Sequence, residues 1–263
     1  MPGSFLFGIV GAVPCGPRII VAMDEIYKKF SMVYDRIHTP NKYWGLIDEI
    51  FAGKNKIGTK PRVLDLGCGT GSFLAGMHER GWEITGLDIS SGMLERAGQK
   101  FKAAGIPCVL CQKDMADFHI EGEFELVTSN FDSVNYVMDI EGIERLFKNV
   151  HAILRENGVF AFDVVTKYQA QNYVNPFKKE FEDVRLEMVP HYDQTSNIKR
   201  LEIDIVSGAD RAKEVHEQKM YDLGDIGLNL KAAGFSEYKM MSIEGKTREI
   251  MDSSTRVYFV AVK

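Results

Sequence analysis

The chain has 263 residues, of which 45% are hydrophobic and 26% are charged, a composition typical of a folded globular protein. This length allows one large domain, or one domain with an insertion. A formal net charge of −5 gives no support for a general polyanion-binding surface, so nucleic acid is not an expected partner. The four cysteines form no disulfide framework, which indicates a reducing compartment and predicts a cytoplasmic protein.

Residues 1–22 differ in character from the rest of the chain. Their apolar run, residues 5–13, is too short to cross a bilayer, and no Lys or Arg precedes it. Neither a membrane anchor nor a secretory signal is therefore expected. We expect residues 1–22 to be a non-native or flexible extension, with Met23 as the natural start.

From Asp24 the pattern becomes helical and aromatic, with apolar residues gathered on one face of each predicted helix. Its aromatic residues include Tyr27, Phe30, Tyr34 and Tyr43. For Tyr34 two interpretations stay open. The ring either packs in the core or contacts a bound ligand.

A strand–turn–helix over residues 63–80 is the most informative stretch. Residues 63–66 form an apolar, strand-like run, and a helical pattern begins at Ser72. Between them, three glycines permit positive φ and remove the Cβ atoms that would hold a ligand away from the backbone: Gly67, Gly69 and Gly71. The first N–H groups of the helix point at the same space. The stretch therefore predicts a nucleotide-like ligand lying against bare backbone.

Two common phosphate-binding loops fit this turn poorly. The dinucleotide fingerprint requires a third glycine at position 72, where this chain has Ser72. No Lys–Ser/Thr pair closes the turn as a P-loop would require. A nicotinamide oxidoreductase is therefore not favoured.

Further strand-like runs alternate with helical patterns and predict an open α/β sheet: residues 84–90, 108–112, 124–129 and 159–165. Asp88 lies about 20 residues after the first glycine, where a carboxylate accepts hydrogen bonds from both ribose hydroxyls. Asn130 and Phe131 follow the run at 124–129. Because ligands of open α/β sheets lie at such strand ends, we expect both residues to line the site.

Cys108 and Cys111 have CxxC spacing. No second pair and no histidine at zinc-ligand spacing accompany them, so no metal is expected. Because they lie in an apolar run, we interpret them as buried structural thiols.

Residues 167–221 interrupt the α/β alternation. Three strand-like runs separated by turn-rich pieces predict a small antiparallel sheet inserted after the fifth strand: residues 184–191, 198–206 and 212–221. Each of the two histidines in this insert is interpreted as a strand-surface residue rather than a catalytic base. Of the two, His216 is a better candidate for a base than His191.

The D-L-G-C-G-T-G stretch at 65–71 resembles motif I of the class I S-adenosylmethionine-dependent methyltransferases, D-x-G-x-G-x-G, at every defined position. Asp88-Ile89 matches the acidic position that follows motif I in this family. Residues 30–35, F-S-M-V-Y-D, resemble the Y/F-x-x-x-Y-D opening of many of its small-molecule members. The family's cofactor, S-adenosylmethionine (AdoMet), carries no phosphate, which accounts for the poor fit to both phosphate loops.

The resemblance covers residues 24–263 and implies a Rossmann-like, seven-stranded methyltransferase sheet with a small antiparallel β insert after strand five. It implies an AdoMet-binding domain made of residues 23–166 and 222–263. The helix at 223–233 and the strands at 235–243 and 255–262 would complete that domain. The insert, residues 167–221, would form a lid over the acceptor pocket.

The resemblance also implies which residues hold the cofactor. Asp114, rather than Asp117, is expected to bind the adenine amino group, with Met115 covering the ring. No residue is marked out as a catalytic base. The expected cofactor-binding residues are Tyr34, Asp65, Gly67, Cys68, Gly69, Gly71, Asp88, Ile89, Asp114, Met115 and Asn130.

The implied function is transfer of a methyl group from AdoMet to N or O of a small molecule, by a monomer or homodimer. Two alternatives stay open: an RNA or protein methyltransferase, and an AdoMet-binding protein without turnover. The fourth strand is not followed by Asn/Asp-Pro-Pro-Tyr/Phe, the tetrapeptide of enzymes that methylate adenine or glutamine amides. This difference argues against those two substrate classes.

Overall fold

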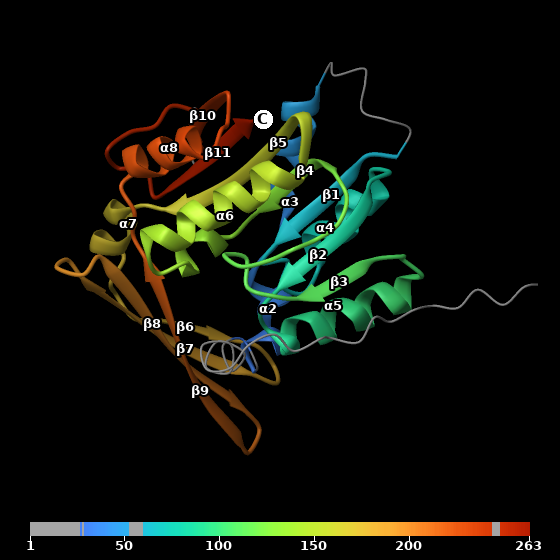
Figure 1. Ribbon diagram of the computed structural model, residues 1–263. Coiled ribbons are helices and arrows are strands. Elements are labelled where there is room, and N and C mark those ends of the chain that lie inside the picture. Colours follow the sequence, from blue (N-terminus) through green and yellow to red (C-terminus); the bar gives the residue numbers. More distant parts are fainter. Residues whose placement is uncertain (1–26, 28, 53–59, 244–247) are drawn as a thin grey trace, which may run out of the picture.

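The computed structural model describes residues 27, 29–52, 60–243 and 248–263. Its larger sheet has seven strands in the order β10-β11-β5-β4-β1-β2-β3 (Figure 1). Only β11 runs antiparallel to its neighbours β10 and β5, and the other pairs are parallel. The strands are β1 (Arg62–Leu66), β2 (Glu83–Asp88), β3 (Val109–Gln112), β4 (Phe124–Ser129), β5 (Leu154–Val165), β10 (Glu237–Ser242) and β11 (Arg256–Val262).

This arrangement confirms the predicted Rossmann-like fold. The strand order reverses at β1, which lies between β2 and β4. In open α/β sheets such a switch point opens a crevice at the carboxyl ends of the strands. The glycine turn follows β1 and therefore lies in that crevice.

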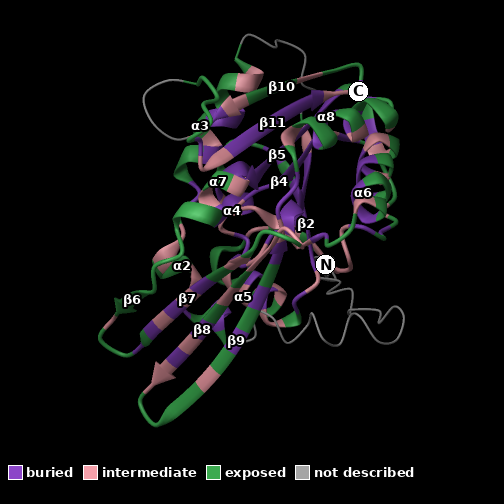
Figure 2. Cartoon of the chain, turned by 90° about the vertical axis from the view of Figure 1, so that its left-hand side faces the viewer, coloured by how far each residue is buried: buried purple, intermediate pink, exposed green. Residues whose placement is uncertain are grey.

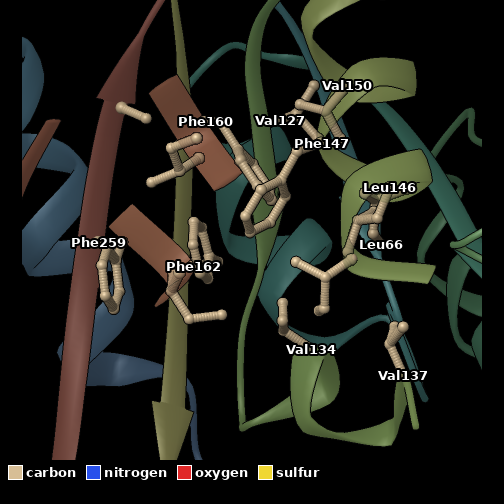
Figure 3. Packing of buried hydrophobic residues seen from close by; sticks show 14 of the residues in the cluster. Leu66, Val127, Val134, Val137, Leu146, Phe147, Val150, Phe160, Phe162 and Phe259 are labelled. Atoms are coloured by element: carbon tan, nitrogen blue, oxygen red, sulfur yellow. The ribbon is translucent and has the colours of Figure 1, made fainter. Parts of the chain in front are cut away.

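Helices cover both faces of the sheet. On one face α6 (Ile140–Ile153) and α8 (Leu223–Ala232) pack against alternate residues of the strands. Figure 3 shows Phe147 of α6 facing Phe160 and Phe162 of β5, and Leu146 lying next to Leu66 of β1. The opposite face packs against α3 (Asn41–Phe51), α4 (Ser72–Glu79) and α5 (Ser91–Ala104). Each fully buried Leu or Phe contributes about 1.5–3 kcal/mol, so this double-sided core holds the strand ends in place.

The insert forms a second, four-stranded antiparallel sheet below the first in Figure 1. Its strands are β6 (Phe177–Glu180), β7 (Arg185–Asp193), β8 (Ile198–Ser207) and β9 (Asp210–Lys219). The sequence pattern predicts only three of them, and it misses both β6 and the short helix α7 (Lys167–Asn172). Strand β6 is exposed along its whole length, so it carries no alternation of buried and exposed residues.

The N-terminal segment packs beneath this second sheet. It consists of the 3-10 helix η1 (Phe30–Met32) and the short helix α2 (Tyr34–Ile37). Phe30 and Val33 share a buried cluster with Leu186 of β7 and Ile203 of β8. In Figure 2 buried, intermediate and exposed residues follow one another along β7 and β8, as in strands with one covered face.

Three further expectations from the sequence can be compared with the structure. Residues 1–22 lie outside the described residues, so the expected extension stays a prediction. Cys108 and Cys111 are half-buried rather than buried, because they lie near the edge strand β3. Within the described ranges, no helix combines the length and the hydropathy that crossing a membrane requires.

Strand β1 carries a carboxyl group inside the sheet. Asp65 is 2% exposed, and its Oδ1 accepts a hydrogen bond of 2.7 Å from Thr128 Oγ1 on the paired strand β4. Burial raises the pKa of Asp65 to about 7, and the Thr128 hydroxyl only partly opposes that effect. The Asp65 side chain is therefore largely neutral below that pH.

Replacing Asp65 with Asn tests this protonation state. A carboxyl group whose pKa is higher in the folded than in the unfolded chain stabilises the fold fully below about pH 4, and loses that contribution as the pH rises through about 7. Asn does not titrate. Relative to Asp65→Asn, the unmodified chain should lose as much as about 4 kcal/mol of unfolding free energy between about pH 4 and pH 8. Urea unfolding of both proteins across this range measures the difference, and a constant difference would contradict the raised pKa.

Candidate functional site

A cavity of about 300 Å³ opens at the carboxyl ends of β1 and β2, beside the glycine turn. Its walls are formed by the glycine turn, the loop after β3, the segment from Ser133 to Arg145 and the N-terminal segment. Seven of the expected cofactor-binding residues line it: Tyr34, Gly67, Gly69, Asp88, Ile89, Asp114 and Met115.

The three glycines of the turn all have positive φ, yet their surroundings differ. A Cβ on Gly67 would lie 2.7 Å from Ser133 Oγ, and one on Gly71 would lie 2.6 Å from the ring of Phe101 on α5. At Gly69 a Cβ would meet nothing closer than 3.9 Å. Gly71 thus allows close packing of α5, whereas Gly69 leaves open space beside the backbone. Gly71 lines neither the cavity nor the recess described below.

Asp88 ends β2 with its carboxylate turned back toward the turn. Its Oδ2 accepts a hydrogen bond from the Gly69 N–H and its Oδ1 accepts one from the Ser90 N–H, each 2.8 Å long. These bonds fix the orientation of a side chain that is only 8% exposed. Because each carboxylate oxygen offers two acceptor positions, the group also suits a pair of ligand hydroxyls.

The loop after β3 supplies another carboxylate to the same cavity. Asp114 lines the cavity, and its Oδ1 accepts a 2.8 Å hydrogen bond from the Ala116 N–H. Met115 lies next to it and approaches the glycine turn. Asp117, the rival acid, has an exposed side chain and is not part of the cavity wall. The geometry therefore favours Asp114 over Asp117.

The N-terminal segment is tied to the glycine turn by Asp35. Its Oδ1 accepts hydrogen bonds from Thr70 Oγ1 at 2.5 Å and Ser72 Oγ at 2.9 Å, and its Oδ2 pairs with Lys100 at 2.8 Å. Burial opposes ionisation, but these partners hold the pKa of Asp35 below its usual value. The anchored segment places Tyr34 in the cavity wall.

A smaller recess of about 20 Å³ lies on the other side of the turn. Three more of the expected residues line this recess: Asp65, Cys68 and Asn130. Tyr34, Gly67 and Gly69 border both spaces. Asn130 is 3% exposed, and its Nδ2 has no hydrogen-bond partner within the described part of the chain. A buried amide N–H₂ without an acceptor is costly, so it indicates a group that a ligand would supply.

Strand β9 presents polar rather than apolar residues to the inside. Glu214, His216 and Gln218 are 8%, 3% and 7% exposed, whereas the apolar Val215 between them is 38% exposed. His216 is therefore not the strand-surface histidine that the sequence pattern predicts. The expectation fails because alternation alone does not say which face of an edge strand is covered.

These polar residues reach the cavity wall. His216 Nδ1 lies 3.0 Å from the Tyr136 hydroxyl, which lies 2.6 Å from the Tyr27 hydroxyl, and both tyrosines line the cavity. Tyr136 belongs to the short helix η2 (Ser133–Tyr136) that follows β4. The sequence analysis assigns no site role to Tyr136. The sequence signal that could have identified Tyr136 as a site residue is its position shortly after the carboxyl end of a predicted parallel strand.

The backbone after β4 is strained. Phe131 and Asp132 have φ angles of 59° and 55°, a left-handed conformation that is costly without glycine. The Asp132 N–H donates to Asp163 Oδ2 at 3.1 Å, and its carboxylate accepts from Arg256 and Gln218. Strain of this kind gathers at functional sites, and here it lies directly beside the recess.

Comparison with known proteins agrees with this geometry. Residues 63–158 match the family model described as a methyltransferase domain. Over 247 residues the chain is 30% identical to the putative methyltransferase YqeM of Bacillus subtilis (strain 168), covering 90% of this chain and 97% of that protein.

Two solved structures extend the likeness to the fold. An S-adenosylmethionine-dependent methyltransferase from Clostridium acetobutylicum ATCC 824 superposes with a TM-score of 0.77 at 25% identity, covering 90% of this chain and 98% of that one. SAM-bound CalS10, an amino pentose methyltransferase from Micromonospora echinaspora, has a TM-score of 0.69 at 21% identity, with coverages of 89% and 95%. With the glycine turn, the strand order and the relative that spans almost its whole length, the chain belongs to the class I S-adenosylmethionine-dependent methyltransferases.

Proposed function

We propose that this enzyme transfers a methyl group from AdoMet to a nitrogen or oxygen atom of a small molecule in the cytoplasm, as a monomer or homodimer. The observation that carries the proposal is the position of the cavity. It lies against the glycine turn, with Tyr27 and Tyr34 in its wall, and the inserted sheet packs against the N-terminal segment that carries them. A cavity walled in by that segment favours a small acceptor over a folded RNA or protein.

The residues present fit the cofactor. Asp88 offers acceptors for ribose hydroxyls and Asp114 one for an adenine amino group. The open space beside Gly69 admits a ligand against the backbone, and the unpartnered Asn130 Nδ2 offers a donor in the adjoining recess. When bound, AdoMet supplies a methyl group on a positively charged sulfur, which a nucleophile displaces in line.

The protein's contribution is to position the acceptor and to exclude water. Holding two reactants in a near-attack geometry supplies about 7–11 kcal/mol of the barrier. Tyr27, Tyr34 and Tyr136 line the cavity, and an aromatic face near a cation stabilises it by about 0.5–2 kcal/mol. The resemblance to an amino pentose methyltransferase supports a small, polar acceptor.

Labelled turnover tests the acceptor class. The chain, incubated with methyl-labelled AdoMet, is offered separately the small-molecule fraction, the RNA and the protein of a bacterial lysate. We expect label to enter only the small-molecule fraction. Label that enters RNA or protein instead would overturn the proposed acceptor class, and a heat-denatured sample of the enzyme controls for spontaneous methylation.

Replacing Asp88 with Ala should weaken AdoMet binding. Hydrogen bonds to a charged group contribute about 1.5–3 kcal/mol, so we expect an affinity roughly 10- to 100-fold lower. Asp88→Asn keeps the shape of the side chain and should show a smaller loss. Calorimetry with AdoMet and with S-adenosylhomocysteine measures both variants, and thermal unfolding shows that they remain folded. Unchanged affinity in Asp88→Ala would remove the ribose assignment.

The pair Asp114→Asn and Asp117→Asn separates the two candidate acids. Only Asp114 lines the cavity, so only its replacement should lower the affinity for S-adenosylhomocysteine, by roughly 5- to 20-fold for one charged hydrogen bond. Asp117→Asn makes the same chemical change three residues away on an exposed side chain. A loss confined to Asp117→Asn would reverse the assignment, and the same calorimetric titration decides between them.

A further inference from the structure

A chain of hydrogen bonds leads from the cavity wall to a carboxylate under the inserted sheet. Tyr27 Oη lies 2.6 Å from Tyr136 Oη, which lies 3.0 Å from His216 Nδ1. On the other side of the imidazole, His216 Nε2 lies 3.1 Å from Glu214 Oε2. The two tyrosines line the cavity, whereas His216 and Glu214 lie behind them, 3% and 8% exposed.

The carboxylate of Glu214 determines which group donates in each of these hydrogen bonds. Burial opposes ionisation of Glu214, but hydrogen bonds from His216 and from the N–H groups of Phe30 and Lys29 hold its pKa below the usual value. An ionised carboxylate only accepts, so His216 Nε2 carries a proton and donates it to Glu214. In a neutral imidazole Nδ1 is then an acceptor, and the Tyr136 hydroxyl donates to it. The Tyr27 hydroxyl in turn donates to Tyr136.

At the cavity end of this series of hydrogen bonds, Tyr27 therefore offers a hydrogen-bond acceptor to a bound molecule. With its proton directed at Tyr136, Tyr27 Oη turns its lone pairs toward a bound molecule. Burial raises the pKa of both tyrosines well above the usual value, so neither ionises under ordinary conditions. Two neutral hydroxyls in series pass a proton inward without holding a charge themselves, and the imidazole at the inner end is the group that can keep it.

We propose that His216 is the proton acceptor for methyl transfer, reached through Tyr27 and Tyr136 and oriented by Glu214. This inference rests on the proposed function. The lone pair of the acceptor forms the new bond to the methyl carbon, the carbon–sulfur bond breaks, and its electrons stay on sulfur. The acceptor's proton passes to Tyr27, the Tyr27 proton to Tyr136, and the Tyr136 proton to His216 Nδ1. The imidazolium that results is paired with Glu214.

Two other polar groups near the acceptor side are less suited to this role. His38 borders the recess, but burial lowers its pKa to about 4, so it holds a proton poorly. Asp132 is buried, which raises its pKa, but Arg256 and Gln218 outweigh that effect and keep the pKa below its usual value. His216, by contrast, has the carboxylate of Glu214 at 3.1 Å from its Nε2, which stabilises a transferred proton.

The arrangement also defines the chemistry of the acceptor. A group that binds to Tyr27 Oη must donate a hydrogen bond and must lose a proton on methylation. Amines, amides and hydroxyls meet both conditions. Tertiary amines and thioethers have no such proton, so the hydroxyls of Tyr27 and Tyr136 would not assist their methylation.

The first test reads the proton positions directly. Nitrogen-15 NMR of histidine-labelled full-length protein reports which imidazole nitrogen carries hydrogen. We expect His216 to be the Nε2–H tautomer, and Tyr136→Phe to shift its Nδ1 resonance by removing the donor. A His216 found as the Nδ1–H tautomer would overturn the proposal, because Nδ1 could not then accept a proton.

The second test is functional. With the methyl-accepting small-molecule fraction of a bacterial lysate as the probe, His216→Asn and Tyr136→Phe should transfer label about 100-fold or more slowly. Both variants should bind S-adenosylhomocysteine as the unmodified chain does. The combination of slow transfer with unchanged binding separates a role in proton transfer from a loss of the cofactor site.

His191→Asn is the matched control, because it makes the same change at an exposed position on strand β7 of the same sheet. Transfer by His216→Asn and Tyr136→Phe at the rate of His191→Asn would overturn the relay and leave the proposed function intact. Failure of the unmodified chain to bind S-adenosylhomocysteine would overturn both.

Discussion

One buried carboxylate, Glu214, joins two parts of the molecule, the N-terminal segment and the inserted sheet. It accepts hydrogen bonds from the N–H groups of Tyr27, Lys29 and Phe30, 2.7–2.9 Å long, and from His216 on its own strand. Burying a charge costs several kcal/mol unless hydrogen bonds replace the lost water, and here four donors do so. The N-terminal segment therefore lies where these donors meet the carboxylate. The cavity wall that contains Tyr27 is thereby joined to the inserted sheet.

The cofactor side of the site is organised by local chain geometry instead. Motif I, Asp88 and Asp114 each lie at or just after the carboxyl end of a strand, and the strands β1, β2 and β3 are consecutive in both sequence and sheet. A short-range pattern therefore determines their relative positions. This explains why the sequence could place the glycine turn, Asp88 and Asp114 at one edge of the sheet, whereas their roles in holding the cofactor stay predictions.

The acceptor side could not be predicted in the same way. Tyr27, Tyr136 and His216 come from three segments that are distant in sequence, and only the packing of the inserted sheet brings them together. The alternation in β9 also misleads, because the apolar Val215 is exposed and its polar neighbours Glu214 and His216 are buried. Strand β6 gives no signal at all, since it buries none of its residues. Hydrophobic periodicity reveals strands that bury apolar residues in a core, and neither β6 nor the covered face of β9 does so.

The two sides of the site meet at the strained residues after β4. Left-handed Phe131 and Asp132 cost about 1–2 kcal/mol each, and Asp163, Tyr43 and Arg256 offset this cost with hydrogen bonds and an ion pair. Arg256 is the first residue of β11 and pairs in register with Val165, the last residue of β5. Because β11 runs antiparallel, its first residue lies at the carboxyl edge of the parallel strands. A parallel strand would place the same residue at the opposite edge, so the single reversed strand is what delivers the guanidinium to the site.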